Sequence, residues 1–362
     1  MKRVCFLIYN LEPGGLQQYL LRLIIFSKGK MDATLIVKSG KGGILLDNFL
    51  ALNVHVININ VGWANIFGWW KVFSIFRKNR FHSVCDMTGN FGGLYLFLAN
   101  LAGINKRVAK YGLSSNHFEP SFLKAKYNAF VNYLVFKNAT KIVSNSTTAL
   151  NYFFPYRTVN ESRCKVIFNG LDAAPYSCEK DFTIREALGI SAQSFVIGNV
   201  GRFDSKKNQQ AVLEMAQVSI KNQKDFHYII CGLRTEELQQ LIEAENLGKF
   251  VHVLGYRNDI PTVLRNFDVF YFPTLTEGQP NALIEALISG LPIIASNISP
   301  IKEVLPNFLY SQLIEPDDIE SAYQKVLEIY EGIYPYEKKE IRNWAARQFN
   351  PVKQFGDFYD CL

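Results

Sequence analysis

The sequence lacks any apolar run long enough to span a bilayer. Its longest weakly polar stretch, residues 91–104, is interrupted by Asn100 and falls short of the roughly 20 apolar residues that a spanning helix needs. Lys2 and Arg3 precede only the apolar residues 4–9, whereas a secretory signal has an apolar core of about 7 to 15 residues followed by a small-residue cleavage site. We therefore predict a protein that stays in the cytoplasm.

Cysteine is scarce, and its placement gives no pairing pattern. None of the six cysteines forms a CxxC pair or lies at metal-ligand spacing from a histidine, so the sequence indicates neither a disulfide framework nor a zinc site. We expect reduced, mostly buried thiols at Cys5, Cys85, Cys164, Cys178, Cys231 and Cys361. The sequence also has no GxGxxG fingerprint, Walker loop or nucleic-acid-binding motif, which removes the main support for NAD-linked, ATP-hydrolysing or nucleic-acid-binding functions.

The composition that remains is that of a folded protein with two domains. The 362 residues are 48% hydrophobic, 14% aromatic and 20% charged, which excludes disordered, collagen-like and coiled-coil chains, and at roughly 150 residues per domain the length favours two. The formal charge of +7 is unevenly divided, because residues 1–172 hold 21 Lys or Arg against 7 Asp or Glu and residues 173–362 hold 18 against 25. The first part, at +14, therefore predicts an anionic partner: a phosphorylated substrate, a membrane surface or nucleic acid.

Runs rich in Val, Ile and Phe alternate with segments of helical period, which is typical of an α/β fold around parallel sheets. Two series of strands are predicted, at 3–9, 33–37, 54–59, 83–86, 107–111, 141–144 and 165–168, and at 195–200, 226–231, 250–254, 269–272 and 292–295. Residues 172–180 have no sustained period and indicate a linker. We predict two doubly wound domains, residues 1–172 and 173–345, a helix in residues 346–362 that packs back on the first, and ligands at the carboxyl ends of strands, in a cleft between the domains.

One strand-to-helix junction, residues 271–287, carries two isolated carboxylates. Pro280 suits the first helical turn, so the free amide groups after it form a seat for an anion. Glu285 is the only formal charge in residues 278–301, and its burial would require hydrogen-bond donors such as the hydroxyls of a ribose. The alternative is that Glu285 lies on an exposed helix edge and that Glu277 is an acid favoured by the helix dipole.

Two further junctions suggest contact with an anion. Residues 198–208 place Arg202 and Lys207 at a helix start, the unfavourable end of the dipole for a cation. A diphosphate in the turn would explain both, since Arg binds phosphate through two hydrogen bonds and Lys acts as a point charge; solvated side chains on a surface turn are the alternative. Gly14 and Gly15 follow the first predicted strand, where a glycine turn serves either ligand approach or plain packing.

Together these motifs resemble the retaining nucleotide-sugar glycosyltransferases of family 4. The resemblance covers almost the whole chain and rests on Gly14-Gly15, Asn169-Gly170-Leu171-Asp172, Gly201-Arg202 with Lys207-Asn208, Glu277 with Glu285, and residues 290–296 followed by Glu303. It implies the GT-B fold, in which two Rossmann-like domains face each other across a cleft. It also implies a nucleotide-diphosphate sugar as donor substrate, with no cofactor and no metal; the sequence has no Asp-x-Asp pair near a predicted strand end.

The resemblance also implies roles for individual residues. Arg202 and Lys207 would hold the donor diphosphate and neutralise charge on the departing nucleotide, and Glu285 would bind the ribose hydroxyls. Glu277 would contact the donor sugar or stabilise positive character at its anomeric carbon, so Glu277, Arg202 and Lys207 are the predicted catalytic residues. Further donor contacts are predicted for Gly14, Gly15, Gly201, Tyr256, Arg257, Gly278, Gln279, Pro280, Asn281 and Ala282. Retention would follow if the leaving phosphate acts as the base.

The chain departs from the family pattern in its first domain. Family members commonly carry a histidine after the strand predicted at 107–111, where this sequence has Lys110 and Tyr111. Lys110 or His117 would then take the acceptor-side role. The remaining histidines fall in or beside predicted strands and are expected to be structural: His55, His82, His227 and His252.

Two segments combine aromatic and basic residues. Residues 63–73 place Trp69, Trp70 and other apolar side chains at helical spacing before the basic cluster 77–80, and residues 118–141 contain several Lys and aromatic residues against the single acid Glu119. Core packing would explain any one of these aromatic residues. With the charge of +14 on the same part of the chain, they favour peripheral attachment to an anionic membrane and a polyprenyl-linked glycan acceptor.

The leading hypothesis is a retaining transferase that moves a hexose or N-acetylhexosamine from a nucleotide-diphosphate donor to a surface glycan, such as O-antigen, capsule or exopolysaccharide. A sugar-nucleotide epimerase on the same fold is an alternative, and it would release altered nucleotide sugar without any acceptor. A non-enzymatic protein that binds an anionic membrane or nucleic acid through its first domain is another. In a binding protein of this kind, Glu277 and Glu285 would have no purpose.

Overall fold

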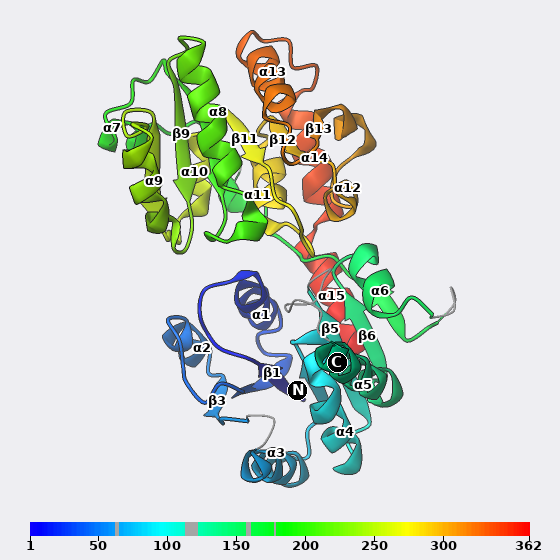
Figure 1. Ribbon diagram of the computed structural model, residues 1–362. Coiled ribbons are helices and arrows are strands. Elements are labelled where there is room, and N and C mark those ends of the chain that lie inside the picture. Colours follow the sequence, from blue (N-terminus) through cyan, green and yellow to red (C-terminus); the bar gives the residue numbers. More distant parts are fainter. Residues whose placement is uncertain (62–64, 113–121, 157–160, 177–178) are drawn as a thin grey trace. The chain divides into compact units, whose positions relative to one another are not determined.

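The protein is described by a computed structural model over residues 1–61, 65–112, 122–156, 161–176 and 179–362. His117 and Cys178 lie outside these ranges. The chain divides into two compact units, named here unit 1 and unit 2 (Figure 1): unit 1 is Met1–Gly170 with Pro351–Leu362, and unit 2 is Leu171–Asn350. The division follows Gly170, two residues before the predicted boundary, and the returning segment starts at Pro351 instead of residue 346.

Unit 1 is built on a seven-stranded parallel sheet in the order β3-β2-β1-β4-β5-β6-β7. Its strands are β1 (Lys2–Ile8), β2 (Met31–Val37), β3 (His55–Asn58), β4 (Ser83–Asp86), β5 (Lys106–Tyr111), β6 (Lys141–Ser144) and β7 (Cys164–Val166). Each overlaps one of the strands predicted for this part of the chain. The apolar runs were informative because a strand that is covered by helices on both faces consists of nearly continuous hydrophobic residues.

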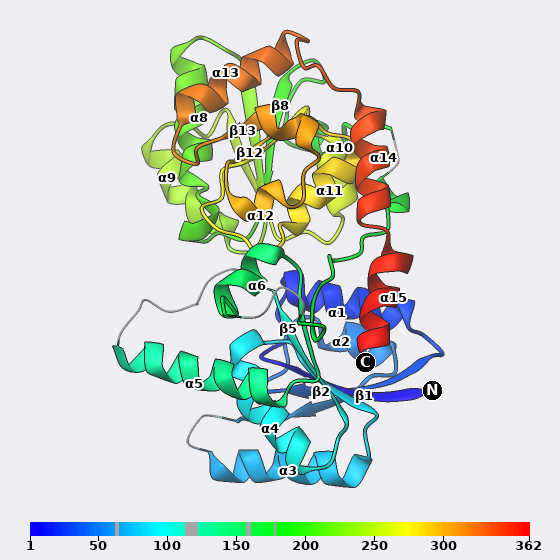
Figure 2. The same ribbon diagram turned by 90° about the vertical axis from the view of Figure 1, so that its right-hand side faces the viewer.

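Helices cover both faces of the unit 1 sheet (Figure 2). On one face lie α1 (Gly15–Phe26), α2 (Leu46–Ala51) and α15 (Pro351–Cys361), and on the other α3 (Ile66–Asn79), α4 (Gly93–Leu101), α5 (Phe122–Asn138) and α6 (Thr147–Phe153). Phe6 and Ile8 of β1 pack with the first group, whereas Cys5 and Leu7 pack with the second. This alternation follows from strand geometry, because successive side chains point to opposite faces.

Unit 2 repeats the architecture with a six-stranded parallel sheet in the order β10-β9-β8-β11-β12-β13. Its strands are β8 (Phe195–Val200), β9 (Phe226–Cys231), β10 (Val251–Gly255), β11 (Val269–Phe272), β12 (Ile293–Ser296) and β13 (Leu313–Ile314). Five of these overlap the predicted strands. The sixth, β13, was not predicted, because two residues are too few to produce a hydrophobic pattern.

The helices of unit 2 enclose an apolar core against its sheet. On one face α8 (Gln210–Lys221) and α13 (Ile319–Tyr330) pack together over Tyr228 and Tyr271. The remaining helical segments are η2 (Ala174–Tyr176), α7 (Thr183–Ala187), η3 (Ser205–Lys207), η4 (Thr235–Leu238), α9 (Gln239–Ala244), α10 (Ile260–Arg265), α11 (Asn281–Ser289), α12 (Ser299–Lys302), η5 (Asn307–Gln312) and α14 (Lys338–Gln348). Unit 1 has one further short turn, η1 (Gly89–Gly92).

The five described cysteines are free thiols, and all but Cys164 are buried. Burial raises the pKa of the Cys5 and Cys85 thiols well above the ordinary value, so both are inert core groups. Within the described ranges, no helix has the length and the hydropathy that crossing a bilayer requires.

Candidate functional site

The junction between β11 and α11 positions the two predicted glutamates. The helix begins at Asn281, and Pro280 is its N-cap, one position earlier than the first-turn site that the sequence suggested. The first intrahelical bond runs from the Ile284 amide to the Pro280 carbonyl, at 3.1 Å. The amides of Asn281, Ala282 and the next residue precede that bond, which is the arrangement that receives an anion at a helix start.

Glu285 lies in the second turn of α11 and is buried, with 8% of its surface exposed. Five neighbouring residues of the same helix, in the range 283–288, are buried with it. The exposed-helix-edge alternative for Glu285 is therefore wrong. A carboxylate at this depth needs hydrogen-bond donors to offset the loss of hydration.

Glu277 and Lys207 form an ion pair, although they are 70 residues apart in sequence. The Glu277 side chain is 8% exposed and that of Lys207 is 26% exposed. Two hydrogen bonds to the Lys206 carbonyl hold the two loops together, from the Thr274 hydroxyl at 2.9 Å and from the Leu275 amide at 2.8 Å. Glu277 therefore acts as a buried partner of a cation, rather than as a solitary acid at a helix start.

The turn after β8 carries Gly201 and Arg202. The Arg202 guanidinium is 3.3 Å from Asp204 and its side chain is 56% exposed, so it is available to an incoming anion. A Cβ atom on Gly232 would lie 2.0 Å from the Gly201 carbonyl oxygen, which explains why a glycine follows β9 at this crossing. The Gln209 side-chain amide donates to the Arg202 carbonyl at 3.0 Å and so supports the same turn.

Tyr256 and Arg257 follow β10 at the same edge of the sheet. Tyr256 is 39% exposed. Asp259 accepts two hydrogen bonds from the Arg257 guanidinium, at 2.8 and 2.6 Å. These bonds lower the pKa of the Asp259 carboxyl and raise that of Arg257, so this guanidinium already has a carboxylate partner.

The unit 2 candidates therefore gather at the carboxyl ends of β8, β10 and β11, where an open parallel sheet binds its ligands. Among them Gln279 is 6% exposed and buried beside the start of α11. Gly278 precedes it in the turn before the helix. In the part of the chain that the structure describes, no group of three or more His, Cys, Asp or Glu side chains is arranged to hold a metal ion.

The unit 1 candidates are not brought together. Gly14 is the N-cap of α1, and Gly15 is its first residue, both exposed. Lys110 is 1% exposed, and its ammonium lies 3.9 Å from the ring centroid of Tyr19 and 5.3 Å from that of Phe358. Burial lowers the pKa of Lys110 to about 8. Lys110 therefore faces the core beneath α1 and α15, away from solvent.

A polar cluster that sequence reasoning missed lies at the carboxyl ends of β2 and β4. Lys38, 6% exposed, and Asp86, fully buried, form an ion pair. Thr88 accepts from the Lys38 ammonium at 2.7 Å and donates to Asp86 at 2.7 Å, and Lys38 lies 4.0 Å above the Tyr95 ring. Burial lowers the pKa of Lys38, while Asp86 partly offsets the shift. The sequence did contain a signal for this cluster, since Lys38 follows the apolar strand β2 and Asp86 ends the apolar strand β4.

Comparison with known proteins shows similarity to glycosyltransferases. Residues 180–347 match the family model described as "Glycosyl transferases group 1". Over 299 residues the chain is 28% identical to UDP-Gal:alpha-D-GlcNAc-diphosphoundecaprenol alpha-1,3-galactosyltransferase of Escherichia coli, covering 80% of this chain and 77% of that protein. It is also 25% identical over 240 residues, covering 64% and 63%, to N-acetylgalactosamine-N,N'-diacetylbacillosaminyl-diphospho-undecaprenol 4-alpha-N-acetylgalactosaminyltransferase of Campylobacter jejuni.

A solved structure shows the fold. The crystal structure of Anabaena Alr3699/HepE in complex with UDP and glucose superimposes with a TM-score of 0.82 at 19% identity, covering 99% of both chains. Two parallel-sheet α/β units and this neighbour confirm the predicted fold class. The chain therefore has the GT-B fold and resembles the group 1 glycosyltransferases, which confirms the family resemblance that its motifs predicted.

Proposed function

We propose that this chain is a retaining, metal-independent glycosyltransferase. It would move a hexose or N-acetylhexosamine from a nucleotide-diphosphate sugar to a polyprenyl-linked glycan in surface polysaccharide synthesis. The observation that carries the proposal is one sheet edge in unit 2 that combines two cations, Arg202 and Lys207, the start of α11 and the buried acid Glu285. Both curated relatives named above have names that specify a diphosphoundecaprenol-linked acceptor.

The chemistry of these groups suits a nucleoside diphosphate. Arg202 and Lys207 supply positive charge, and the amides of Asn281 and Ala282 supply donors of the kind that bind phosphate at helix starts. Glu285 offers two acceptor oxygens for the paired hydroxyls of a ribose. Tyr256 and the Arg257 turn would line the base, since they follow β10 at the same edge. Gly14 and Gly15, at the start of α1, remain predicted donor-binding residues.

Retention results in a single step when bond formation and departure occur on one face of the sugar, and this is the route that we propose. The acceptor hydroxyl would form a bond to the anomeric carbon while the bond from that carbon to the diphosphate oxygen breaks. The electron pair stays on the departing oxygen, which takes the proton of the acceptor hydroxyl. Lys207 and Arg202 would stabilise the negative charge that grows on the diphosphate, and the Glu277 carboxylate would stabilise positive character at the anomeric carbon.

The acceptor is assigned to unit 1, with its excess of basic residues. Of the two predicted acceptor-side residues, Lys110 faces the core and cannot reach an acceptor, so His117 is the one that stays a prediction. The Lys38–Asp86 pair is a further candidate, because it lies at the carboxyl edge of its sheet and combines a cation with an acceptor of hydrogen bonds. Peripheral attachment to a membrane from the cytoplasmic side would bring unit 1 to a lipid-linked substrate.

The donor site is tested by calorimetric titration with UDP, GDP, ADP, TDP and CMP. We expect one nucleoside diphosphate to bind preferentially, and Glu285→Gln to weaken it by about tenfold or more, since the lost hydrogen bonds involve a charged acceptor. Glu331→Gln, an exposed acid at the end of α13, is the matched control and should bind as the wild type does. Equal weakening by both variants, or no binding at all, would contradict the assignment.

The reaction is tested with the sugar derivatives of the nucleotide that binds. The anomeric configuration of the product, read from its NMR coupling constants, should match that of the donor, and EDTA should leave the rate unchanged. Inversion or loss of activity in EDTA would refute the corresponding part of the proposal. Conversion of the nucleotide sugar to an isomer without any acceptor would identify the chain as an epimerase instead.

A further inference from the structure

Three consecutive helices on one face of the unit 1 sheet contain no acidic residue. Helices α3, α4 and α5 together carry six Lys or Arg and no Asp or Glu. They lie side by side, with α4 between the other two in both views (Figures 1 and 2). We call this set the acid-free layer. It places six of the 22 Lys and Arg residues of unit 1 on one side of its sheet, with no acid among them in these helices.

The outer side of α3 carries exposed apolar side chains in its first two turns, although its inner side is already part of the core. Val72 and Phe76 are buried against the sheet. On the other side, Ile66 is 79% exposed, Phe67 86% and Trp70 67%. Large hydrophobic side chains gathered in this way on a monomer surface indicate contact with a partner or a membrane.

The neighbouring helices continue the same surface. On α4, Phe97 is 39% and Leu101 56% exposed. Helix α5 also carries Lys124, Lys126 and Lys137. Its exposed aromatic residues are Phe122 at 73%, Tyr127 at 42%, Phe130 at 53% and Tyr133 at 57%. The Lys126 ammonium lies 4.3 Å from the ring centroid of Phe122. Aromatic rings with basic side chains among them are typical of segments that lie in a membrane interface.

A shallow depression of about 470 Å³ is lined entirely by residues of α3. Phe67, Trp70 and Ile75 form its apolar part, and Lys71 and Lys78 are basic members of the same lining. A site made by a single helix gives no enclosure for a soluble ligand, whereas a lipid surface supplies its own apolar volume. The depression therefore fits an acyl chain or headgroup boundary better than a discrete small molecule.

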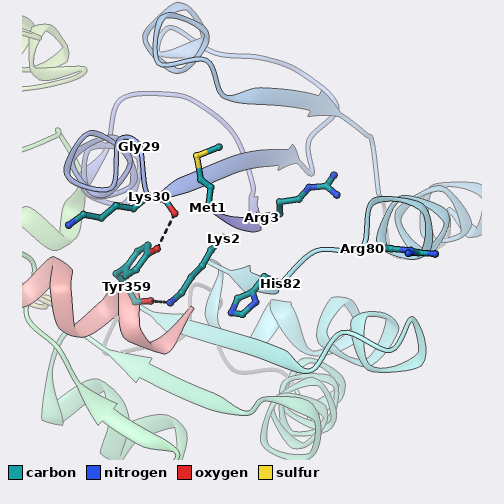
Figure 3. A pocket seen from close by; sticks show the side chains of 8 residues that line it. All are labelled: Met1, Lys2, Arg3, Gly29, Lys30, Arg80, His82 and Tyr359. Carbon is teal, nitrogen blue, oxygen red and sulfur yellow. Dashed lines mark hydrogen bonds between the residues drawn. The ribbon is translucent and has the colours of Figure 1, made fainter.

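More positive charge lies beyond the end of α3, where Arg80 is the C-cap residue. A pocket of about 520 Å³ is lined by Lys2, Arg3, Lys30, Arg80, His82 and other residues (Figure 3). The charged ends of Lys30, Arg3 and Arg80 point in different directions, and the Lys2 ammonium is bonded to the Tyr359 carbonyl at 3.0 Å. These cations do not converge on one anion. They distribute positive charge along the surface, which suits contact with the anionic headgroup layer of a bilayer.

We propose that the acid-free layer docks unit 1 on an anionic bilayer. The apolar side chains of α3 and α5 would enter the interface, and the lysines around them would pair with anionic headgroups. Nucleic acid is a poorer match, because Ile66 and Phe67 offer neither charge nor hydrogen bonds to it. The docking rests on the peripheral attachment that the proposed function includes, and it names the surface responsible. Vesicle binding is measured without the transfer reaction, so failure of the docking and failure of the transferase assignment can be told apart.

The test is co-sedimentation of the full chain with vesicles of phosphatidylcholine alone or with about one third phosphatidylglycerol. We expect binding to the anionic vesicles that is about tenfold tighter than to the neutral ones. The double substitution Phe67→Ser with Trp70→Ser should weaken it about tenfold. The matched control replaces exposed apolar residues on the opposite face of the sheet, Ile25→Ser with Leu50→Ser, and should bind within about twofold of wild type.

Nucleotide titration of each variant provides the separate readout. Unchanged nucleotide affinity with lost vesicle binding supports the docking surface alone. Equal binding to the neutral and the anionic vesicles would overturn the proposal. Equal loss of vesicle binding in the two double variants would also overturn it. Sedimentation velocity without lipid must show a monomer for wild type, because a dimer abolished by the Phe67 and Trp70 changes would assign the surface to a second copy of this chain.

Discussion

Removal of the Lys207 ammonium should have two separable consequences. In Lys207→Met, the Glu277 carboxylate is left at 8% exposure without its cation. Removing one partner from a fully buried pair costs about 3–5 kcal/mol. Because Lys207 keeps 26% exposure and water can partly replace it, we expect about 2 kcal/mol of destabilisation, or about 4–8 °C in Tm for a unit of this size.

The second consequence concerns the donor site. A double substitution, Lys207→Met with Glu277→Gln, also removes the carboxylate charge that Lys207 neutralised and should recover most of the lost stability. It should not recover nucleoside diphosphate affinity, since the cation for the diphosphate is still missing. Lys206→Met, one position earlier on the same turn and exposed, is the control.

Thermal unfolding and calorimetric titration of these variants give the two readouts. If Lys207→Met were as stable as the wild type, or if the double variant were no more stable than the single one, the Lys207–Glu277 ion pair would not contribute to the stability of unit 2. If the double variant regained full affinity for the nucleotide, Lys207 would have no part in holding the diphosphate.

Two further predictions follow from backbone contact and burial. Gly232→Ala places a Cβ atom 2.0 Å from the Gly201 carbonyl oxygen. We therefore expect about 1–3 kcal/mol of destabilisation and at least about tenfold weaker nucleotide binding. The control is Gly248→Ala, whose added Cβ has nothing within 4 Å and which should be neutral in both assays. Burial lowers the pKa of Lys110 from 10.5 to about 8. Between pH 8 and pH 10.5 Lys110 is therefore protonated in the unfolded chain but not in the folded one, so the free energy of unfolding rises with pH across this range. Lys110→Met should accordingly be more stable than wild type at pH 7, by up to about 3 kcal/mol, and urea unfolding should show the difference vanishing near pH 10.5; a constant difference across the window would refute the burial argument.

Sequence reasoning located most strands because both sheets are parallel and covered on both faces, so their strands consist of continuous apolar runs. It failed at β13, where Leu313 and Ile314 alone form the strand. It also located the cations and acids of unit 2, because Lys207 and Glu285 follow strands at points where a charge is unexpected. The start of α11 was placed one residue early, since Pro280 fits both the N-cap and the first turn.

The sequence by itself determined the two α/β units, the excess positive charge of unit 1 and the segments in which charged residues interrupt apolar ones. Tertiary structure alone decided which of these residues meet. The Lys207–Glu277 and Lys38–Asp86 pairs join residues 70 and 48 positions apart, and strand order sets such contacts, not sequence spacing. It also decided that Lys110 faces the core, because successive strand side chains point to opposite faces and only the position of α1 and α15 shows what covers each face.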